Sequence, residues 1–285
     1  MPTTVITGAN SGIGLEAAVA IARAGHRVVL AVRNPTKGAA ALADIQTRSG
    51  NDDVEQLPLD LASIASIRDF ADTWNARNEP INVLINNAGV VMKERTVTDD
   101  GFETTFGVNH LGHFLLTHLL LDDLVAAGDD TRVVTVASGA HFFARQGLDF
   151  DDLMFERRRY SQMGMGAYAA SKLANVMFTR QLARRLADTN IAANCVHPGF
   201  VATNFAREGD GGRLGDLSMR LAKPFARSPE KGARTSVHVA LSPEVAGVTG
   251  QYFVNSKVHA CSKFAADDAA CARLWNTSES LLGLD

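Results

Sequence analysis

The sequence contains few cysteines. Three are present among 285 residues, and none belongs to a CxxC pair. So small a number excludes a disulfide framework and indicates a reducing compartment. We expect Cys195 to lie in the core, at the end of a β-strand. Cys261 and Cys271 lie in the C-terminal region without a nearby set of metal ligands.

Long hydrophobic runs are also lacking. No apolar stretch approaches the roughly twenty residues that a membrane-spanning helix requires, and no cleavable leader precedes the first predicted strand. We therefore expect a cytoplasmic protein without a membrane span.

Charge of one sign is not in excess. The net charge is −3, and the basic run at 157–159 has Asp149, Asp151 and Asp152 close by. This balance gives no general attraction to phosphate polymers, so we expect no nucleic-acid partner. We expect no metal site either, because His110 and His113 share a helix but have no third ligand.

What the chain does contain is a regular alternation of strands and helices. We expect strands at 4–7, 27–32, 54–59, 81–86, 132–136, 191–196 and 251–254. We expect helices at 15–24, 63–77, 229–241 and 264–282, and one long helix that ends at Leu124. This pattern predicts an α/β fold of the Rossmann type, with a doubly wound parallel sheet and helices on both faces. The length of 285 residues favours a single domain, over residues 1–285.

The first strand runs into a glycine-rich turn. Gly8, Gly12 and Gly14 follow a GxxxGxG spacing just before the helix. Glycines let backbone amides approach a pyrophosphate, and a helix N-terminus adds partial positive charge. The pattern predicts a dinucleotide-binding loop; the alternative is a tight turn with no ligand.

The second strand ends in a basic residue. NAD-binding folds usually place Asp or Glu about twenty residues after the glycines, whereas this chain has Arg33. A guanidinium binds a 2′-phosphate in bidentate fashion, so we expect NADP(H) rather than NAD(H). The alternative is a solvated arginine at the end of a strand.

Tyr168 and Lys172 lie four residues apart and therefore share one face of a helix. An ammonium near a phenolate favours the ionised phenol, so we expect Lys172 to lower the pKa of Tyr168. The pair predicts a general acid/base. Taken alone, the same spacing also occurs on solvated helix faces.

Further motifs follow in a fixed order along the chain. They are TGANSGIG at 7–14, Asp60-Leu61, NNAG at 86–89, VNHLGHF at 108–114, the strand 133–138 ending in Ser138, YAASKLAN at 168–175, HPG at 197–199 and a tail near Leu274-Trp275. In these motifs, over essentially its whole length, the chain resembles the short-chain dehydrogenase/reductase superfamily. The closest resemblance is to its retinol-dehydrogenase-like branch.

The resemblance implies roles for individual residues. Tyr168 would be the general acid/base, Ser138 would bind the substrate oxygen, and Lys172 would hold the nicotinamide ribose. Asn109 would hold a water that links Lys172 to solvent. The residues implied to bind the cofactor are Gly8, Asn10, Ser11, Gly12, Ile13, Gly14, Arg33, Asp60, Leu61, Asn87, Ala88, Gly89, Tyr168, Lys172, Pro198, Gly199, Val201 and Thr203. Two alternatives stay open: Asp60 could cap the next helix, and Asn109 could satisfy buried backbone groups.

Two stretches interrupt the strand and helix rhythm. The insertion 139–166 is rich in Phe and Met, which could line a pocket for a lipophilic substrate or anchor the connection to the core. The stretch 200–225 has glycines at 209, 211 and 212 before apolar residues, and we expect a lid there.

The residues and the resemblance together predict an NADP(H)-dependent enzyme that interconverts an alcohol and a carbonyl on a small, apolar substrate. Two alternatives are a non-catalytic NADP(H)-sensing regulator and a protochlorophyllide-reductase-like enzyme. Regulators of this superfamily usually lack the tyrosine or the lysine, both of which are present here. The resemblance also implies a possible homodimer or homotetramer through the helices that carry Asn109 and Tyr168, although the long insertion could hinder that contact.

Overall fold

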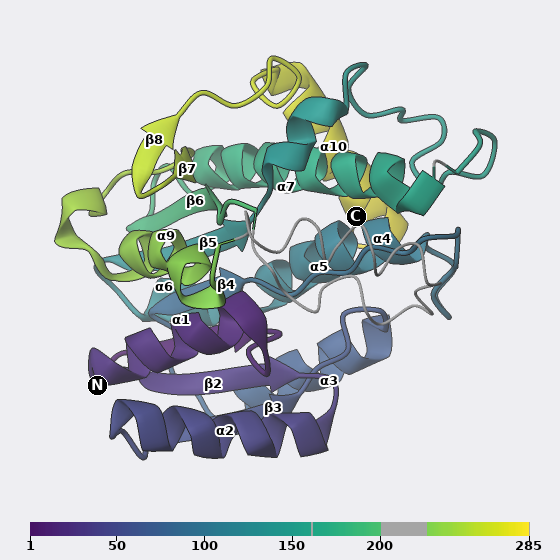
Figure 1. Ribbon diagram of the computed structural model, residues 1–285. Helices are drawn as coiled ribbons and strands as arrows, with labels where there is room; N and C mark the ends of the chain where they lie inside the picture. Colours follow the sequence, from purple (N-terminus) through teal and green to yellow (C-terminus); the bar gives the residue numbers. More distant parts are fainter. Residues whose placement is uncertain (161, 201–226, 285) are drawn as a thin grey trace.

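The computed structural model describes residues 1–160, 162–200 and 227–284. Its centre is one eight-stranded sheet with the order β3-β2-β1-β4-β5-β6-β7-β8 (Figure 1). All neighbouring strands are parallel except β7 and β8. The strands are β1 (Thr3–Thr7), β2 (Arg27–Val32), β3 (Val54–Pro58), β4 (Val83–Asn86), β5 (Thr131–Val136), β6 (Ile191–His197), β7 (Tyr252–Val254) and β8 (Lys257–His259). The predicted Rossmann-type fold is confirmed.

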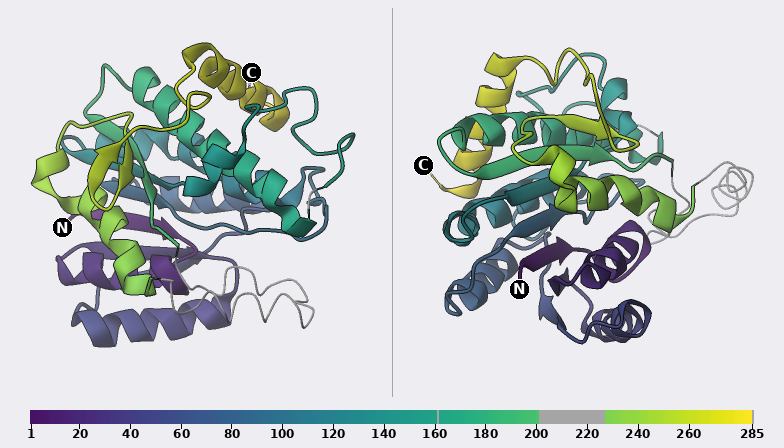
Figure 2. Two further views of the ribbon diagram at one scale, coloured as in Figure 1. Left: turned by 45° about the horizontal axis from the view of Figure 1, so that its top comes forward. Right: turned by 90° about the vertical axis from the view of Figure 1, so that its left-hand side faces the viewer.

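Helices cover both faces of the sheet, as the two views of Figure 2 show. One face carries α1 (Gly12–Arg23), α2 (Pro35–Ser49) and α9 (Pro229–Leu241). The other carries α3 (Ile64–Asn75), α4 (Thr104–Phe106), a π-helical turn (Gly107–Leu111), α5 (Gly112–Leu119), α6 (Leu121–Ala126), α7 (Met165–Arg185) and α10 (Asp268–Leu282). Each face has its own hydrophobic cluster, so the strands between them are buried from both sides.

The strand order reverses direction between β1 and β4. The chain builds outward from β1 to β2 and β3, then returns to add β4 on the other side of β1. In open parallel sheets, ligands bind beyond the carboxyl ends of the strands at such a switch point. The ends of β1 and β4, at Thr7 and Asn86, therefore mark the place where a cofactor cleft is expected.

The helix expected to run to Leu124 is in fact interrupted twice. It contains a π-helical turn at Gly107–Leu111, and α5 stops at Leu119 before α6 begins at Leu121. Glu103 starts this stretch: its buried carboxylate accepts hydrogen bonds from the backbone N–H groups of Thr105 (2.9 Å) and Phe106 (2.7 Å). π-Helical turns often lie at functional sites, and this one contains Asn109.

Strand β8 was not predicted. It is three exposed residues long and pairs antiparallel with β7. The two residues between these strands, Asn255 and Ser256, both have positive φ (52° and 61°). That conformation suits a tight two-residue hairpin, but the usual sequence signal for it is Asn-Gly.

The C-terminal helix α10 packs along α7, as Figure 1 shows. The Trp275 ring stacks on Phe178 of α7 at 5.9 Å between centroids and meets Phe114 of α5 edge-on at 4.7 Å. Ser278 lies 2.9 Å from Nε2 of His110 in the π-helical turn. Helix α10 thus covers parts of the helices that carry Asn109 and Tyr168. The resemblance assigns these two helices to subunit contact.

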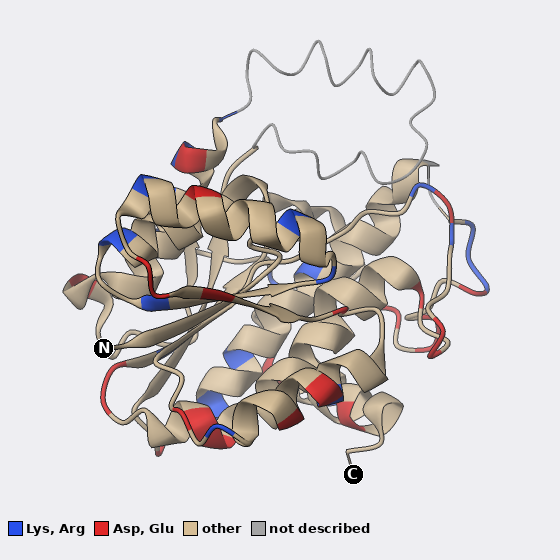
Figure 3. Cartoon of the chain, turned by 90° about the horizontal axis from the view of Figure 1, so that it is seen from below, with Lys and Arg blue, Asp and Glu red and all other residues tan. Residues whose placement is uncertain are grey.

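Charged residues are interspersed over the surface (Figure 3). Basic side chains are partly paired; Arg27, for example, bonds Glu55 and Glu79 at 2.8 and 2.6 Å. No helix among the described residues is both long enough and apolar enough to cross a bilayer. Within the same residues, no group of three or more His, Cys, Asp or Glu side chains is placed to bind a metal. The absence of a nucleic-acid partner stays a prediction.

The aromatic contacts of Trp275 lead to a stability prediction. Trp275→Ala should lower the free energy of unfolding by about 3–5 kcal/mol, because it leaves a cavity between α10, α5 and α7. Urea unfolding measures this loss. The matched control is Phe143→Ala, whose ring is 67% exposed and whose loss should cost less than about 0.5 kcal/mol. Equal effects of the two substitutions would contradict the packing role of α10.

Candidate active site

Helix α7 and strand β5 bring three polar side chains together. Tyr168 lies in the first turn of α7, Lys172 lies one turn later, and Ser138 follows the end of β5. The Ser138 hydroxyl and the Tyr168 phenol share a side-chain hydrogen bond. Nζ of Lys172 donates to the Val136 carbonyl at 2.7 Å and lies 5.8 Å from the centre of the Tyr168 ring. The side-chain pair expected from the YxxxK spacing therefore meets the predicted serine.

The electrostatics of this pair differ from the expectation. Burial lowers the pKa of Lys172 to about 7 and raises the pKa of Tyr168, although the hydrogen bond with Ser138 partly lowers the latter. We expected Lys172 to bring the pKa of Tyr168 down. Instead, burial dominates, and the ammonium is directed at a backbone carbonyl. The phenol is therefore protonated near neutral pH.

Two histidines hold the turn that carries Ser138. The Ser138 carbonyl accepts a hydrogen bond from Nδ1 of His141 at 2.7 Å, and the Gly139 N–H donates to Nδ1 of His197 at 3.1 Å. The Ser138 hydroxyl also accepts from the Ala140 N–H at 3.1 Å, which starts a 3-10 helix over Gly139–Phe143. The HPG motif pointed to His197, but no signal in the sequence indicated His141.

Asn109 fastens the loop after β4 to α7. Its Nδ2 donates to the Val90 carbonyl (2.9 Å) and to the Ser171 hydroxyl (3.0 Å), and its Oδ1 accepts from the Val90 N–H (2.8 Å). The side chain thus satisfies buried backbone groups, which was the alternative left open for it. The water expected beside Asn109 stays a prediction.

The glycine loop has the geometry that a dinucleotide requires. Gly8 and Gly12 have positive φ (65° and 57°). A Cβ on Gly14 would lie 2.7 Å from the Gly8 carbonyl oxygen and 2.5 Å from Nδ2 of Asn87, so only glycine fits there. Ser11 makes no side-chain cap, and the first turn of α1 carries no acidic residue. Its amides are thus suited to an anion, and the loop fits a pyrophosphate.

Thr7 and Asn87 tie the ends of β1 and β4 together at the switch point. Nδ2 of Asn87 donates to the Thr7 carbonyl at 2.7 Å, and the Thr7 hydroxyl accepts from the N–H groups of Asn87 and Ala88, both at 2.9 Å. Ala88 also lies against the glycine loop, since a Cβ on Gly8 would come within 3.0 Å of it. These contacts position the loop; the ribose contact expected of Asn87 stays a prediction.

Other predicted cofactor residues also follow the carboxyl ends of strands. Arg33 is exposed just after β2, and Lys37, which sequence reasoning missed, is exposed in the first turn of α2. Asp60 accepts from the Ala62 N–H at 3.0 Å, so it shapes the turn before α3, whose cap is Ser63. The side chain of Leu61 is buried in the core, and its contact with the cofactor stays a prediction.

The HPG turn and the expected lid are described only in part. Pro198 is buried, and Gly199 has a φ of 86° with the Arg227 side chain packed against it. Val201, Thr203 and the rest of the predicted lid, 201–225, lie outside the described residues.

The apolar residues of the insertion 139–166 divide into two groups. Phe155 is 5% exposed and packs with Ala167 and Ala170, while Phe150 and Met154 pack against the main core, so these three anchor the connection. Side chains close in sequence to Ser138 and Tyr168 are instead exposed, namely Phe142 (48%), Phe143 (67%), Met163 (53%) and Met165 (44%). The anchoring role is thus confirmed for Phe150, Met154 and Phe155, and the pocket for a lipophilic substrate stays a prediction.

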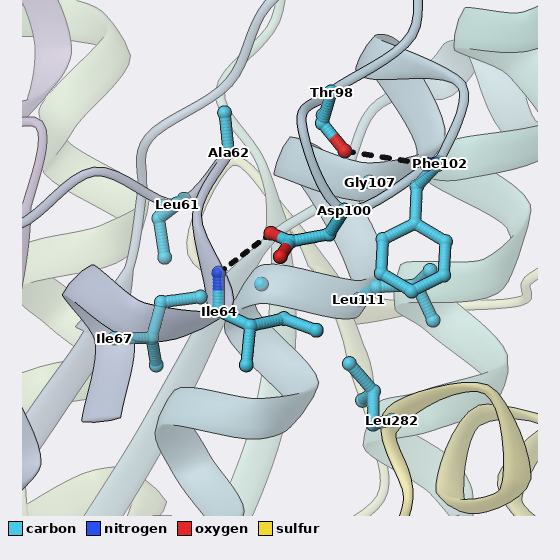
Figure 4. A pocket seen from close by; sticks show the side chains of 11 residues that line it. Leu61, Ala62, Ile64, Ile67, Thr98, Asp100, Phe102, Gly107, Leu111 and Leu282 are labelled. Carbon is cyan, nitrogen blue, oxygen red and sulfur yellow. Dashed lines mark hydrogen bonds between the residues drawn. The ribbon is translucent and has the colours of Figure 1, made fainter.

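A small cavity lies away from these residues, between α3, the π-helical turn and α10 (Figure 4). Its volume is about 10 Å³, and its walls include Leu61, Ile67, Leu111 and Leu282. None of the four predicted catalytic residues lines it. A space of this size holds about one water molecule, so it is not a substrate site.

Comparison with known proteins agrees with this geometry. The family model described as "short chain dehydrogenase" matches residues 2–148 and 158–211. Retinol dehydrogenase 12 of Homo sapiens is 45% identical over 280 residues, covering 98% of this chain and 86% of the relative. Retinol dehydrogenase 13 of Homo sapiens is 42% identical over 287 residues, covering 99% and 85%.

Solved structures have the same fold. An uncharacterised protein from Mycobacterium paratuberculosis superposes with a TM-score of 0.78 at 36% identity, covering 99% of this chain and 94% of the other. RhlG of Pseudomonas aeruginosa, in a complex with NADP, gives a TM-score of 0.69 at 23% identity, covering 89% and 94%. The family match and the level of identity to the two retinol dehydrogenases place this chain in the short-chain dehydrogenase/reductase superfamily, as an oxidoreductase of its retinol-dehydrogenase-like branch.

Proposed function

We propose that the protein is an NADP(H)-dependent oxidoreductase that interconverts an alcohol and a carbonyl, with Tyr168 as the general acid/base. The observation that carries this proposal is the hydrogen bond between the Tyr168 phenol and the Ser138 hydroxyl, with the Lys172 ammonium buried beside the ring. When bound, the nicotinamide supplies or accepts the hydride.

The chain's own residues handle the oxygen and its proton. In carbonyl reduction, the Ser138 hydroxyl donates a hydrogen bond to the carbonyl oxygen, where negative charge develops. The Tyr168 phenol donates its proton to that oxygen, which becomes the alcohol hydroxyl, and a tyrosinate remains. Lys172 in its charged form stabilises the tyrosinate. In alcohol oxidation, each of these proton movements runs in reverse.

The NADP(H) preference rests on the charge at the end of β2. Arg33 stands where an acidic residue would favour the unphosphorylated ribose, and Lys37 adds a second cation in the first turn of α2. The glycine loop fits a pyrophosphate with either cofactor, so the basic pair carries the choice of NADP(H).

A lipophilic substrate is supported by the exposed apolar side chains near the site. Phe142 and Phe143 follow Ser138, Met165 begins α7 just before Tyr168, and Phe200 (60% exposed) follows the HPG turn. A large contiguous apolar patch on a protein surface commonly marks a binding site. The relatives named retinol dehydrogenases favour a long-chain or retinoid-like alcohol or aldehyde. The cytoplasmic location stays a prediction.

Tyr168→Phe tests the acid/base role. It should lower kcat by about 10²–10⁴-fold, because the proton donor is lost, while NADPH binding measured by fluorescence should stay close to wild type. Tyr160→Phe is a matched control, since Tyr160 lies in the preceding connection and bonds Glu103 at 3.0 Å. The control should keep its kcat, and an active Tyr168→Phe enzyme would refute the mechanism.

Arg33→Ala tests the cofactor choice. The loss of a charge-assisted contact should raise the Kd for NADPH by about ten- to hundredfold and leave that for NADH nearly unchanged. Arg23→Ala removes an exposed arginine from the last turn of α1, at the opposite edge of the sheet, and should change neither Kd. If Arg33→Ala weakens both cofactors equally, the NADP(H) assignment is wrong.

The pH profiles of kcat/KM for carbonyl reduction and for alcohol oxidation should cross near neutral pH. Burial lowers the pKa of Lys172 to about 7 and raises the pKa of Tyr168, so Lys172 is the one of the two that loses its proton near neutral pH. Reduction needs both groups protonated, so its kcat/KM should fall about tenfold per pH unit above this pKa. Oxidation needs the pair with one proton fewer, so its kcat/KM should rise with pH up to about 7 and then level off.

A variant with a fixed charge separates this pair from other titrating groups. In Lys172→Arg, the guanidinium stays charged over the whole range, so the step near pH 7 should disappear from both profiles. Profiles with an unchanged step in this variant would show that another group controls the reaction.

A further inference from the structure

His113 connects the cofactor end of the sheet to the π-helical turn. It lies in the first turn of α5 and is 1% exposed. Its Nε2 is 2.9 Å from the Thr7 hydroxyl, and its Nδ1 is 3.1 Å from the Asn109 carbonyl oxygen. Neither the glycine-loop motif nor the YxxxK motif includes this residue.

The direction of these two hydrogen bonds follows from counting donors and acceptors. The Thr7 hydroxyl accepts from two backbone N–H groups, those of Asn87 and Ala88, both at 2.9 Å, which occupies its two lone pairs. Its proton must then point elsewhere. Two acceptors are in reach: His113 Nε2 at 2.9 Å and the Ile85 carbonyl at 3.4 Å. The shorter contact favours the imidazole.

The tautomer of His113 follows. If Nε2 accepts, the neutral ring carries its proton on Nδ1 and donates it to the Asn109 carbonyl. Burial, with a smaller contribution from the charge of Lys172, lowers the pKa of His113 to about 4, although the hydrogen bond with the Asn109 carbonyl partly raises it, so the ring is neutral at pH 7. Among the residues that the structure describes, neither ring nitrogen of His113 makes another hydrogen bond.

The same chain of bonds continues to the acid/base residue. Nδ2 of Asn109 donates to the Ser171 hydroxyl at 3.0 Å, and that hydroxyl donates to the backbone carbonyl of Tyr168 at 2.9 Å. Thr7, Asn109 and Ser171 are each less than 1% exposed, so water competes little for these bonds.

We propose that His113 is a positioning residue: as the Nδ1–H tautomer, it holds Asn109 and the backbone of Tyr168 in register with the β1–β4 end of the sheet where the cofactor binds. It touches neither substrate nor cofactor. This inference rests on the proposed function for its effect on turnover, but the arrangement of its hydrogen bonds is open to test without any substrate.

The first experiment reads the tautomer directly. In protein labelled with ¹⁵N-histidine, NMR should show a neutral ring with the proton on Nδ1 at pH 7 whose signal is absent from His113→Phe. His141, whose Nδ1 donates to the Ser138 carbonyl, should give a second signal of this kind that His113→Phe retains. Thr7→Val, which removes the hydroxyl at nearly constant volume, should change the signal, and Thr7→Ser should restore it. A proton on Nε2, or a charged ring at pH 7, would overturn the proposal.

The second experiment measures the consequence for the site. Thr7→Val and His113→Phe should each lower kcat at least tenfold with a smaller change in the KM for NADPH, and the double variant should be no worse than the poorer single one, because both break one chain. Thr7→Ser should restore kcat to within about threefold of wild type. Multiplicative losses in the double variant would contradict a single connected chain.

A matched control removes a similar bond on the other side of the same turn. Ser278→Ala deletes the buried hydroxyl that lies 2.9 Å from Nε2 of His110, and it should destabilise the fold without lowering kcat. A loss of kcat as large as that of Thr7→Val would reduce His113 to a general packing role and overturn the proposal.

Amide hydrogen exchange separates this proposal from the proposed function. Thr7→Val should speed exchange at 107–111 and around Tyr168 more than Ser278→Ala does. If wild type turns over no alcohol or carbonyl, the proposed function fails, and the tautomer and exchange results still decide the role of His113. Equal exchange in the two variants would contradict that role.

Discussion

The structure of the site depends on a lysine amine held inside the protein. Lys172 is 2% exposed, and its Nζ donates to the carbonyl of Val136, the last residue of β5. Burial of a charge without full compensation disfavours the charged form, which is why the pKa of Lys172 falls to about 7. The same burial raises the pKa of Tyr168. In the free protein, burial thus has a larger effect on the pKa of Tyr168 than the attraction between its phenolate and the Lys172 ammonium, which the sequence spacing led us to expect.

This balance has a consequence for the chemistry. A lysine with an ordinary pKa would stay charged at any physiological pH and would act only as a fixed charge. With a pKa of about 7, it gains or loses its proton near neutral pH. In the proposed reaction, the number of protons that the tyrosine and lysine hold together would distinguish the form that donates from the form that accepts.

Much of the fold and part of the site could be predicted from the sequence. The predicted strand 27–32 and the predicted helix 229–241 agree with β2 and α9 at both ends, because clear turn or capping residues bound both segments. The positions of Ser138 and Tyr168 followed from motifs at the ends of a strand and in a helix. Local spacing specifies which residues share a face, and this held for Tyr168 and Lys172.

Other features depend on contacts between distant segments, which spacing does not encode. The net pKa direction of Tyr168 depends on burial by several elements, and the bond from His141 to Ser138 depends on the path of the 3-10 helix. His113 could be placed on a helix from the sequence, but its partner Thr7 lies 106 positions away. His110, three residues earlier, bonds a different hydroxyl, that of Ser278, so the two rings face opposite sides of the turn.

Helix α10 also shields the π-helical turn from solvent. Its Trp275 and Ser278 cover α5, α7 and the π-helical turn, and so they exclude water from the side of that turn opposite Thr7. A buried turn cannot exchange its hydrogen bonds with solvent, so each broken bond there carries a desolvation cost. Because α10 covers one side of the π-helical turn and the β1–β4 end of the sheet covers the other, the turn that contains Asn109 is enclosed on both sides. The position of α7 relative to the glycine loop is thereby set before any ligand binds, which reduces the ordering that binding must supply.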